Sequence, residues 1–269
     1  LAHPWSAQFT PTIYQDIDEA LAAEKPDIVV VSTRPDLNVE LIERSLRAGC
    51  HVIAEKPIAV DEAGLLRLHK VVQETGKPIL PMLGMFDTPA FVEARELMEQ
   101  GIIGESVLVN VRKSYQWGTR ADWFQQREIY GGIWGWVGIH AFNIAAHIIG
   151  RNAVKVLAAQ EQNCFHPEYA PGCPDCLTGL FVLEGGVQMT ASVDLLRPDG
   201  QTSWGDDWIR IVGSEGSLEA NPALGTIRLI RKGQEEELRT VTSVAPPFYT
   251  AFLDAVKTGA DFSDLTALG

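Results

Sequence analysis

A lysine at the end of a short apolar run is the first residue whose position suggests chemistry. The run that starts at His51 leads into Glu55, Lys56 and Pro57. In an open sheet of parallel strands, ligands bind at the carboxyl ends of the strands, so these side chains would enter a ligand crevice. A partly desolvated lysine loses its proton readily and could exchange a proton with a bound hydroxyl group near neutral pH. An ion pair between Glu55 and Lys56 explains the same pattern equally well.

Four residues recur along one face of a predicted helix in the second half of the chain. Trp136, His140, Asn143 and His147 follow one another at spacings of four, three and four, among mostly apolar neighbours. A polar stripe on a buried helix needs hydrogen-bond partners or a ligand. His140 could act as a general acid or base on a substrate hydroxyl, because the ordinary pKa of histidine lies close to physiological pH. Taken alone, a buried histidine is more often only hydrogen-bonded.

Other side chains could contribute to the same ligand sites. Four residues close the apolar run that starts at Asp27 and could line a cofactor: Ser32, Thr33, Arg34 and Pro35. Trp123 and Trp136 could contact the apolar faces of a sugar ring, although indole rings also build ordinary cores. Four charged residues could add polar contacts or simply form a solvated strand face: Arg112, Lys113, Arg120 and Asp122.

Three cysteines and a histidine lie within one short stretch: Cys164, His166, Cys173 and Cys176. Thiolate and imidazole groups are the ligands of structural zinc. The stretch holds only one Cys-x-x-Cys pair, so we expect no metal, with these four residues as the only candidate ligands. A redox pair is less favoured still, because Cys176 does not begin a helix after a strand.

Charge and composition exclude several kinds of partner. The 269 residues carry a net charge of -13 and no basic cluster, so nucleic acid is not expected as a partner. Residues 131–150 carry no formal charge and have the length of a membrane span. Five glycines, two histidines and Asn143 within them favour a buried segment that lines a site over a membrane helix. The start at Leu1 shows no secretory signal, and we expect a cytoplasmic protein.

Two patterns of hydrophobicity divide the chain near residue 104. Before it, short β-branched runs at 27–33, 51–57 and 78–84 alternate with helical stretches at 15–24, 37–48, 61–75 and 89–100. After it, strand-like runs are joined by glycine-containing turns, with helices at 138–149 and 248–257; the runs are 107–115, 155–160, 178–183, 187–195, 208–212 and 226–231. We therefore predict an α/β protein with a doubly wound Rossmann-type parallel-sheet domain at 1–104. An α+β domain with a mainly antiparallel open sheet follows at 105–269.

The ordered set of motifs resembles the Gfo/Idh/MocA oxidoreductase family. Ala54–Pro57 after a strand, Gly131-Gly132, and Gly138–His140 carry the likeness. Residues 32–36, 101–105 and 181–189 also resemble segments of that family, so the likeness spans nearly the whole chain.

The resemblance implies a dehydrogenase or reductase that transfers a hydride between NAD or NADP and a sugar, polyol or related carbohydrate. Lys56 would stand at the family's catalytic lysine, and His140 would be its catalytic histidine. The cofactor-binding residues would be Ser32, Thr33, Arg34, Pro35, Asn38, Glu55 and Lys56. The substrate-binding residues would be Trp123, Trp136 and Asn143. The second domain would support a homo-oligomer, a dimer or a tetramer.

Three departures from the family pattern leave other functions open. The Gly-x-Gly-x-x-Gly turn that approaches a pyrophosphate is not in the sequence, and we expect the βα unit that carries it to precede Leu1. Trp136 replaces the family's aspartate, and Asn38 stands where many members have histidine. The change at Trp136 slightly favours a non-catalytic sugar- or nucleotide-binding regulatory protein on the same fold. A third hypothesis is a metal-dependent hydrolase that uses His140, His147 and the cysteines.

Overall fold

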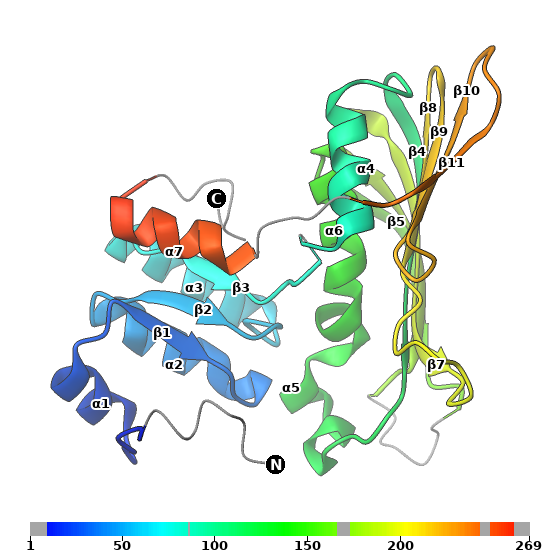
Figure 1. The fold of residues 1–269 in the computed structure, drawn as a ribbon. Coiled ribbons are helices and arrows are strands. Elements are labelled where there is room, and N and C mark those ends of the chain that lie inside the picture. The colour runs from blue at the N-terminus through cyan, green and yellow to red at the C-terminus, as the bar shows by residue number, and fades with distance from the viewer. Residues whose placement is uncertain (1–9, 86, 166–172, 243–247, 261–269) are drawn as a thin grey trace.

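Two sheets organise the part of the chain that the structure, a computed structural model, describes: residues 10–85, 87–165, 173–242 and 248–260. A small sheet has three strands and a large sheet has eight. In Figure 1 the small sheet and its helices lie to the left of the large sheet, and the long helices α4 and α6 stand between the two. The predicted fold class, an α/β unit followed by an α+β unit, is confirmed.

The small sheet is parallel and is made by the first half of the chain. Its strands lie in the order β1 (Ile28–Val31), β2 (His51–Ala54) and β3 (Ile79–Pro81). Helix α1 (Ile17–Glu24) precedes β1, while α2 (Pro35–Arg47) and α3 (Glu62–Thr75) connect the strands. Asp61 begins α3 as a cap, because its carboxylate accepts the backbone N–H of Gly64 at 2.7 Å. The alternation of side chains along β2 sends Val52 and Ala54 toward the core shared with α2 and α3.

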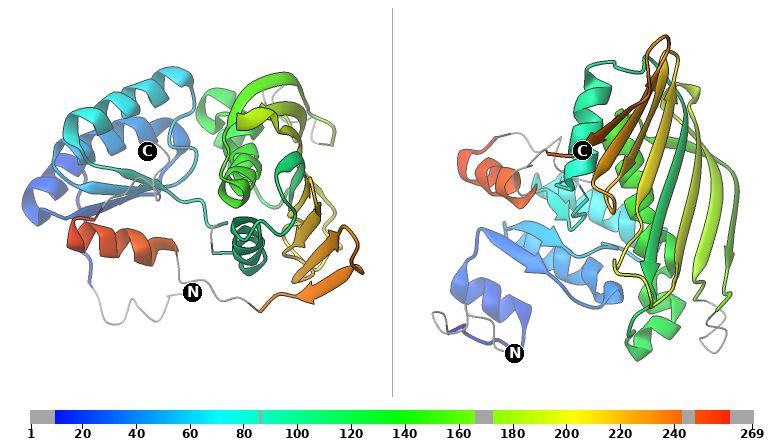
Figure 2. Two further views of the ribbon diagram at one scale, coloured as in Figure 1. Left: turned by 90° about the horizontal axis from the view of Figure 1, so that it is seen from above. Right: turned by 45° about the vertical axis from the view of Figure 1, so that its right-hand side comes forward.

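The opposite face of this sheet is covered by the last described helix. Helix α7 (Phe248–Thr258) places Phe252 in a small buried cluster with Ile53 of β2 and Leu80 of β3. Figure 2 shows α7 beside the small sheet and remote from the outer strands of the large one. Helices therefore lie on both faces of the parallel sheet, as in a doubly wound fold.

The large sheet is open and mainly antiparallel. Its order is β11-β10-β9-β8-β4-β7-β6-β5, and only β4 and β7 run parallel to each other. The strand bounds are β4 (Ser106–Gln116), β5 (Ala153–Gln162), β6 (Cys176–Leu183), β7 (Gln188–Arg197), β8 (Trp208–Gly213), β9 (Gly216–Asn221), β10 (Thr226–Arg231) and β11 (Glu237–Thr240). The short turn η4 (Glu184–Gly186) joins β6 to β7, where the sequence predicted a hairpin.

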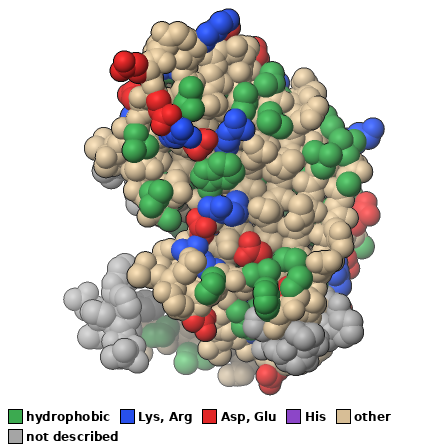
Figure 3. Space-filling model, turned by 90° about the vertical axis from the view of Figure 1, so that its right-hand side faces the viewer, with side chains coloured by type: hydrophobic (Ala, Val, Ile, Leu, Met, Phe, Trp, Pro, Cys, Tyr) green, Lys and Arg blue, Asp and Glu red, His purple; other side chains and the backbone are tan. Residues whose placement is uncertain are grey.

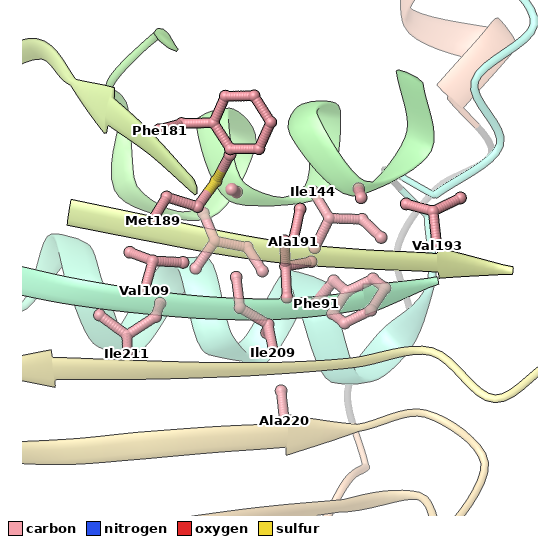
Figure 4. Close-up of a cluster of buried hydrophobic side chains, with 14 of the residues drawn as sticks. Phe91, Val109, Ile144, Phe181, Met189, Ala191, Val193, Ile209, Ile211 and Ala220 are labelled. Atoms are coloured by element: carbon pink, nitrogen blue, oxygen red, sulfur yellow. The ribbon is translucent and has the colours of Figure 1, made fainter. Parts of the chain in front are cut away.

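One face of the large sheet is buried by a row of helices. These are α4 (Pro89–Glu99), η2 (Asp122–Gln125), α5 (Arg127–Tyr130), the π-helix η3 (Trp134–Gly138) and α6 (Ile139–Ile149). Figure 4 shows Phe91 of α4 and Ile144 of α6 in one cluster with Val109, Ala191 and other inward side chains of the strands. The domain boundary expected at residue 104 stays a prediction, but α4 packs with this second core and α7 with the first sheet.

The other face of the large sheet is polar over its centre. Asn110 of β4 donates to Thr190 of β7 at 2.7 Å and accepts from Arg210 of β8 at 3.3 Å. Figure 3 shows this side of the molecule with apolar, basic and acidic side chains interspersed. The expected homo-oligomer stays a prediction.

The apolar segment that resembles a membrane span is built into this second core. Among the described residues, Arg127–Ile149 is the one helical stretch long and apolar enough to cross a membrane, and half of its apolar window is buried. It is divided into α5, η3 and α6, and α6 packs against α4 and β4. Its apolar side chains are therefore explained by packing within the protein.

Candidate functional site

Lys56 lies directly beyond β2, at the carboxyl edge of the parallel sheet. Its Nζ donates to the carbonyl oxygen of Trp136 at 2.9 Å and lies 4.0 Å from the centroid of a Trp136 ring. Burial, helped by the charges of Arg120 and Lys113 and opposed by that of Glu55, lowers the pKa of Lys56 to about 8. An amine with this pKa exchanges a proton readily at neutral pH.

The π-helix η3 brings Trp136 to the lysine. Gly135 of this helix lies beside the strand-exit segment, where a Cβ would be in ordinary van der Waals contact with the Pro57 ring at 3.4 Å. Wide helical turns of this kind occur often at functional sites. Trp136 also closes an aromatic cluster, with ring centroids 5.4 Å from Phe124, 5.7 Å from Tyr130 and 5.9 Å from Trp123.

His140 is buried on α6, one turn after Trp136. Its ring meets Tyr115 edge-on with centroids 6.3 Å apart, and its Nδ1 has no hydrogen-bond partner among the described residues. Burial, together with the charges of Lys56 and Lys113, lowers the pKa of His140 to about 2. The imidazole is therefore neutral at physiological pH, and the electrostatic influence of Lys56 places both predicted catalytic side chains in one neighbourhood.

Sequence reasoning missed one acidic member of this neighbourhood. Lys113 of β4 is 1% exposed and forms an ion pair with Asp207, which precedes β8. Burial lowers the pKa of Lys113 and raises that of Asp207, and each charge partly offsets the effect on its partner. The consecutive pairs Arg112-Lys113 and Asp206-Asp207 were a usable signal, because strand alternation sends one member of each pair inward.

The predicted cofactor residues lie along the carboxyl edge of the parallel sheet. Asn38 is fully buried: its Nδ2 donates to the carbonyls of Glu55 and Pro57 at 3.2 and 2.9 Å, and its Oδ1 accepts from Thr33 at 2.9 Å. Asn38 thus fixes the segment that carries Lys56. Ser32 and Thr33 are exposed.

The start of α2 completes this edge. Arg34 is exposed and forms a 2.6 Å ion pair with Asp36, and Pro35 is buried in the first turn of α2. Among the described residues, no side chain caps the start of that helix.

The predicted substrate residues lie on different elements and differ in their contacts. Asn143 lies on α6 close to His140 in sequence, and its Oδ1 is buried without a hydrogen-bond partner among the described residues. Trp123 lies on η2 and packs against Phe124 and Trp136. His147 lies farther along α6, where its ring contacts Arg95 of α4 at 3.1 Å, and burial lowers its pKa to about 4.

The cysteines form a separate cluster beyond the aromatic residues. The Sγ atoms of Cys164 and Cys176 lie 3.5 Å apart, and Asp175 joins them within ligand distance of one another. The Asp175 carboxylate, however, accepts the backbone N–H groups of Cys164 and Phe165, both at 2.8 Å. Cys173 donates to the carbonyl of Phe124 at 2.9 Å. His166 lies outside the described residues, so the set of four candidate ligands stays untested.

A cavity of about 620 Å³ lies at the ends of β4 and β7. It is lined by Trp117–Thr119, Phe165 and Leu195–Asp199. None of these residues belongs to the Lys56 and His140 neighbourhood. The cavity nevertheless adjoins the aromatic cluster around Trp136, because Trp117 packs edge-on against Phe124 with ring centroids 5.9 Å apart.

The groups at the carboxyl edge fit one part of a nicotinamide dinucleotide. The Ser32 hydroxyl and the Arg34 guanidinium are donors suited to ribose and phosphate oxygens, and the start of α2, which no described side chain caps, would face a phosphate with its positive end. The unpartnered Nδ1 of His140 and Oδ1 of Asn143 are buried polar atoms that a bound ligand would satisfy. When bound, the nicotinamide would accept or supply a hydride.

Profiles of known families match most of the chain. Residues 2–82 match the profile described as the oxidoreductase family, NAD-binding Rossmann fold, and residues 91–219 match the GFO/IDH/MocA C-terminal domain. Inositol 2-dehydrogenase of Rhizobium meliloti is 32% identical over 142 residues, which are 53% of this chain and 42% of that protein. D-glucoside 3-dehydrogenase of Escherichia coli is 28% identical over 153 residues, 55% of this chain and 43% of that protein. These alignments thus span less than half the length of the two curated relatives.

Solved structures show the same arrangement of domains. A putative oxidoreductase from Thermotoga maritima superposes with a TM-score of 0.89 at 29% identity, over 98% of this chain and 79% of that one. An inositol dehydrogenase homologue from Azotobacter vinelandii, complexed with NADH and myo-inositol, shares the fold with a TM-score of 0.74 at 19% identity, over 90% of this chain and 70% of that one. With an NAD-binding Rossmann domain and the family's C-terminal domain both present, the chain belongs to the Gfo/Idh/MocA family of oxidoreductases.

Proposed function

We propose that the protein is an NAD(P)-dependent dehydrogenase or reductase that acts on a CH–OH group of a sugar, polyol or related carbohydrate. The observation that carries this proposal is the Lys56 amine at the carboxyl edge of the parallel sheet, bonded to the Trp136 carbonyl one helical turn before His140, whose buried Nδ1 has no hydrogen-bond partner among the described residues. The family membership supplies the oxidoreductase class. The names of two relatives, an inositol and a glucoside dehydrogenase, favour a carbohydrate as substrate.

Lys56 would handle the proton of the reacting hydroxyl group. A base with a pKa near the working pH combines a sufficient deprotonated fraction with enough basicity to accept a proton. Contact with the Trp136 carbonyl and ring holds the amine in one place. For dehydrogenation the free amine would accept the proton, and for reduction the ammonium would donate it.

His140 would orient the same hydroxyl without becoming charged. An imidazole whose pKa lies near 2 keeps one nitrogen as a donor and the other as an acceptor throughout the physiological range. It can therefore hold a substrate oxygen by a hydrogen bond while Lys56 takes the proton. Asn143, Trp123 and Trp136 would bound the substrate on the side of the second domain.

The cofactor would lie along the carboxyl edge of the small sheet. Ser32, Thr33, Arg34 and the first turn of α2 at Pro35 would contact it. Asn38 would contribute indirectly, because its hydrogen bonds fix the segment that carries Glu55 and Lys56. Whether NAD or NADP is used depends on contacts to the ribose, which these residues do not define.

The test is the substitution Lys56→Met in the intact protein. Turnover of a carbohydrate substrate should fall by about 10² to 10⁴, the usual contribution of a positioned acid or base, while nicotinamide binding, measured by fluorescence titration, should persist. Lys70→Met removes a lysine whose side chain is 74% exposed on α3 and should leave both quantities unchanged. A Lys56→Met protein with wild-type turnover would refute the assigned role.

The same assay separates an enzyme from a regulatory binding protein on this fold. The observation that favours a binding protein is the indole side chain at position 136, in a residue whose backbone carbonyl accepts the Lys56 hydrogen bond. Such a protein would bind the nucleotide and the carbohydrate but would show no change in nicotinamide absorbance with any member of a panel of polyols and aldoses.

A further inference from the structure

Two consecutive ion pairs join β4 to the segment before β8. Arg112 pairs with Asp206 at 2.9 Å, and Lys113 pairs with Asp207. Because side chains alternate along a strand, the two pairs lie on opposite faces of the sheet. The Arg112–Asp206 pair is partly exposed, with side-chain exposures of 39% and 29%, whereas those of Lys113 and Asp207 are 2% and 13%.

The buried pair belongs to the neighbourhood of Lys56 and His140. Lys113 Nζ lies 3.4 Å from the sulfur of Met85, which follows β3, so it reaches from the second sheet to the strand exits of the first. The same atom lies 4.4 Å from the centroid of the Tyr115 ring, and that ring packs edge-on against His140. Met85, Tyr115 and Asp207 therefore fix the Lys113 ammonium next to the predicted catalytic histidine.

The pair is incompletely satisfied by the protein. Asp207 Oδ2 is bonded to Lys113, but Asp207 Oδ1 is buried and has no hydrogen-bond partner among the described residues. Buried carboxylate oxygens are normally hydrogen-bonded, and an ionised carboxylate can only accept. The missing partner is thus a donor, and a hydroxyl group of a ligand would supply it.

We propose that Asp207 and Lys113 form a substrate subsite in which Asp207 Oδ1 accepts a hydrogen bond from a second hydroxyl group, on a carbon other than the one that is oxidised. The ion pair with Lys113 favours the ionised form of the carboxylate and fixes its position. The subsite selects polyhydroxylated neutral substrates, because an acceptor-only oxygen discriminates against an ether oxygen, a carboxylate or a phosphate at that position. The inference rests on the proposed function. It also explains how a site with an indole at position 136 still contains a carboxylate, contributed here by a different element.

The first measurement uses the unaltered protein. A panel of polyols, aldoses and methyl glucosides is assayed for NAD- and NADP-linked turnover, and the preferred substrate is compared with its mono-deoxy derivatives. Loss of the hydroxyl that contacts Asp207 should lower kcat/KM about 10- to 100-fold, the range of one hydrogen bond to a charged group. Because no residue is changed, folding cannot explain the result.

The second measurement identifies the residue. In Asp207→Asn the kcat/KM for the preferred substrate should fall by a similar factor, while that for the discriminating deoxy derivative should change little. Asp206→Asn is the matched control, since it alters the neighbouring acid on the outer face, and it should retain the wild-type ratio. The double variant Lys113→Met with Asp207→Asn leaves no unpaired buried charge and should lose the same discrimination if Asp207→Asn alone does not fold.

The outcomes separate this inference from the proposed function. If the unaltered protein turns over no member of the panel, the proposed function is overturned and the subsite falls with it. If the protein is active but no deoxy derivative is disfavoured, or if the Asp207 variants disfavour it as strongly as the unaltered protein does, the subsite alone is overturned.

Discussion

At the scale of single residues, burial does more than charge to set the chemistry of the site. For Lys56, His140 and Lys113 alike, desolvation is the largest cause of a lowered pKa. Nearby cations lower the pKa of Lys56 and of His140 further, whereas the charge of Asp207 opposes the shift at Lys113. The consequence differs between them. His140 loses its charge altogether, Lys113 keeps a carboxylate partner, and Lys56 is left with a pKa near neutral pH.

This difference predicts a pH dependence that belongs to Lys56. Dehydrogenation needs the free amine, so kcat/KM should rise about tenfold per pH unit below the Lys56 pKa of about 8 and level off above it. Reduction needs the ammonium and should show the opposite limb. The check is a pH–rate profile of kcat/KM, with ¹⁵N NMR of the lysine amine as an independent titration. A profile that stays flat through this range, or one that keeps its inflection in Lys56→Met, would contradict the assignment.

At the scale of elements, the strand-exit segment after β2 is fixed by a single side chain of α2. Asn38 bonds the carbonyls of Glu55 and Pro57, on either side of Lys56, and also accepts the Thr33 hydroxyl from the end of β1. One amide therefore couples two strand exits to one helix. Its complete burial makes water a poor substitute for the lost donors.

Replacement of this amide should destabilise the protein measurably. Asn38→Leu leaves buried carbonyl groups without donors and should lower the free energy of unfolding by about 1–3 kcal/mol, as measured by urea denaturation. Ser45→Ala is the control on the same helix: Ser45 is equally buried, but among the described residues its hydroxyl bonds the Leu41 carbonyl of its own helix and no other element. Its effect should be clearly smaller. Equal losses for the two variants would show that Asn38 contributes only packing.

The elements themselves were more predictable than the contacts between them. The cap at Asp61 and the glycine turn at Gly185 are local signals, and the structure confirms a helix and a hairpin there. The strand expected to reach Pro57 ends at Ala54, because the chain turns where Asn38 holds it, and that contact lies 17 to 19 residues away in sequence. Asp207 was missed for the same reason. The consecutive charges at 112–113 and 206–207 are a local signal, but the pairing of β4 with β8 that brings them together is not specified by any local pattern.

At the scale of the whole molecule, the path of the chain crosses between the two sheets more than once. After the first sheet, α4 joins the core of the second, and after the second sheet α7 returns to cover the first. The periodicity of α7 predicted a helix but could not show which sheet receives it. The face of the parallel sheet formed by Ile53 and Leu80 is therefore buried by residues from the far end of the sequence.

Because α7 packs on the parallel sheet, a core substitution in α7 should destabilise that sheet. Phe252 is fully buried between Ile53 and Leu80, so Phe252→Ala should lower the free energy of unfolding by about 3–5 kcal/mol, the usual range for a truncated core phenylalanine. Its neighbour Leu253 is 38% exposed, and Leu253→Ala should change stability by less than about 1 kcal/mol. Amide hydrogen exchange should locate the loss in β1, β2 and β3, and leave the protection of β4 and β7 near its original level. Equal deprotection of both sheets would instead mean that they unfold as one unit, and unchanged protection of β2 would mean that α7 does not stabilise the parallel sheet.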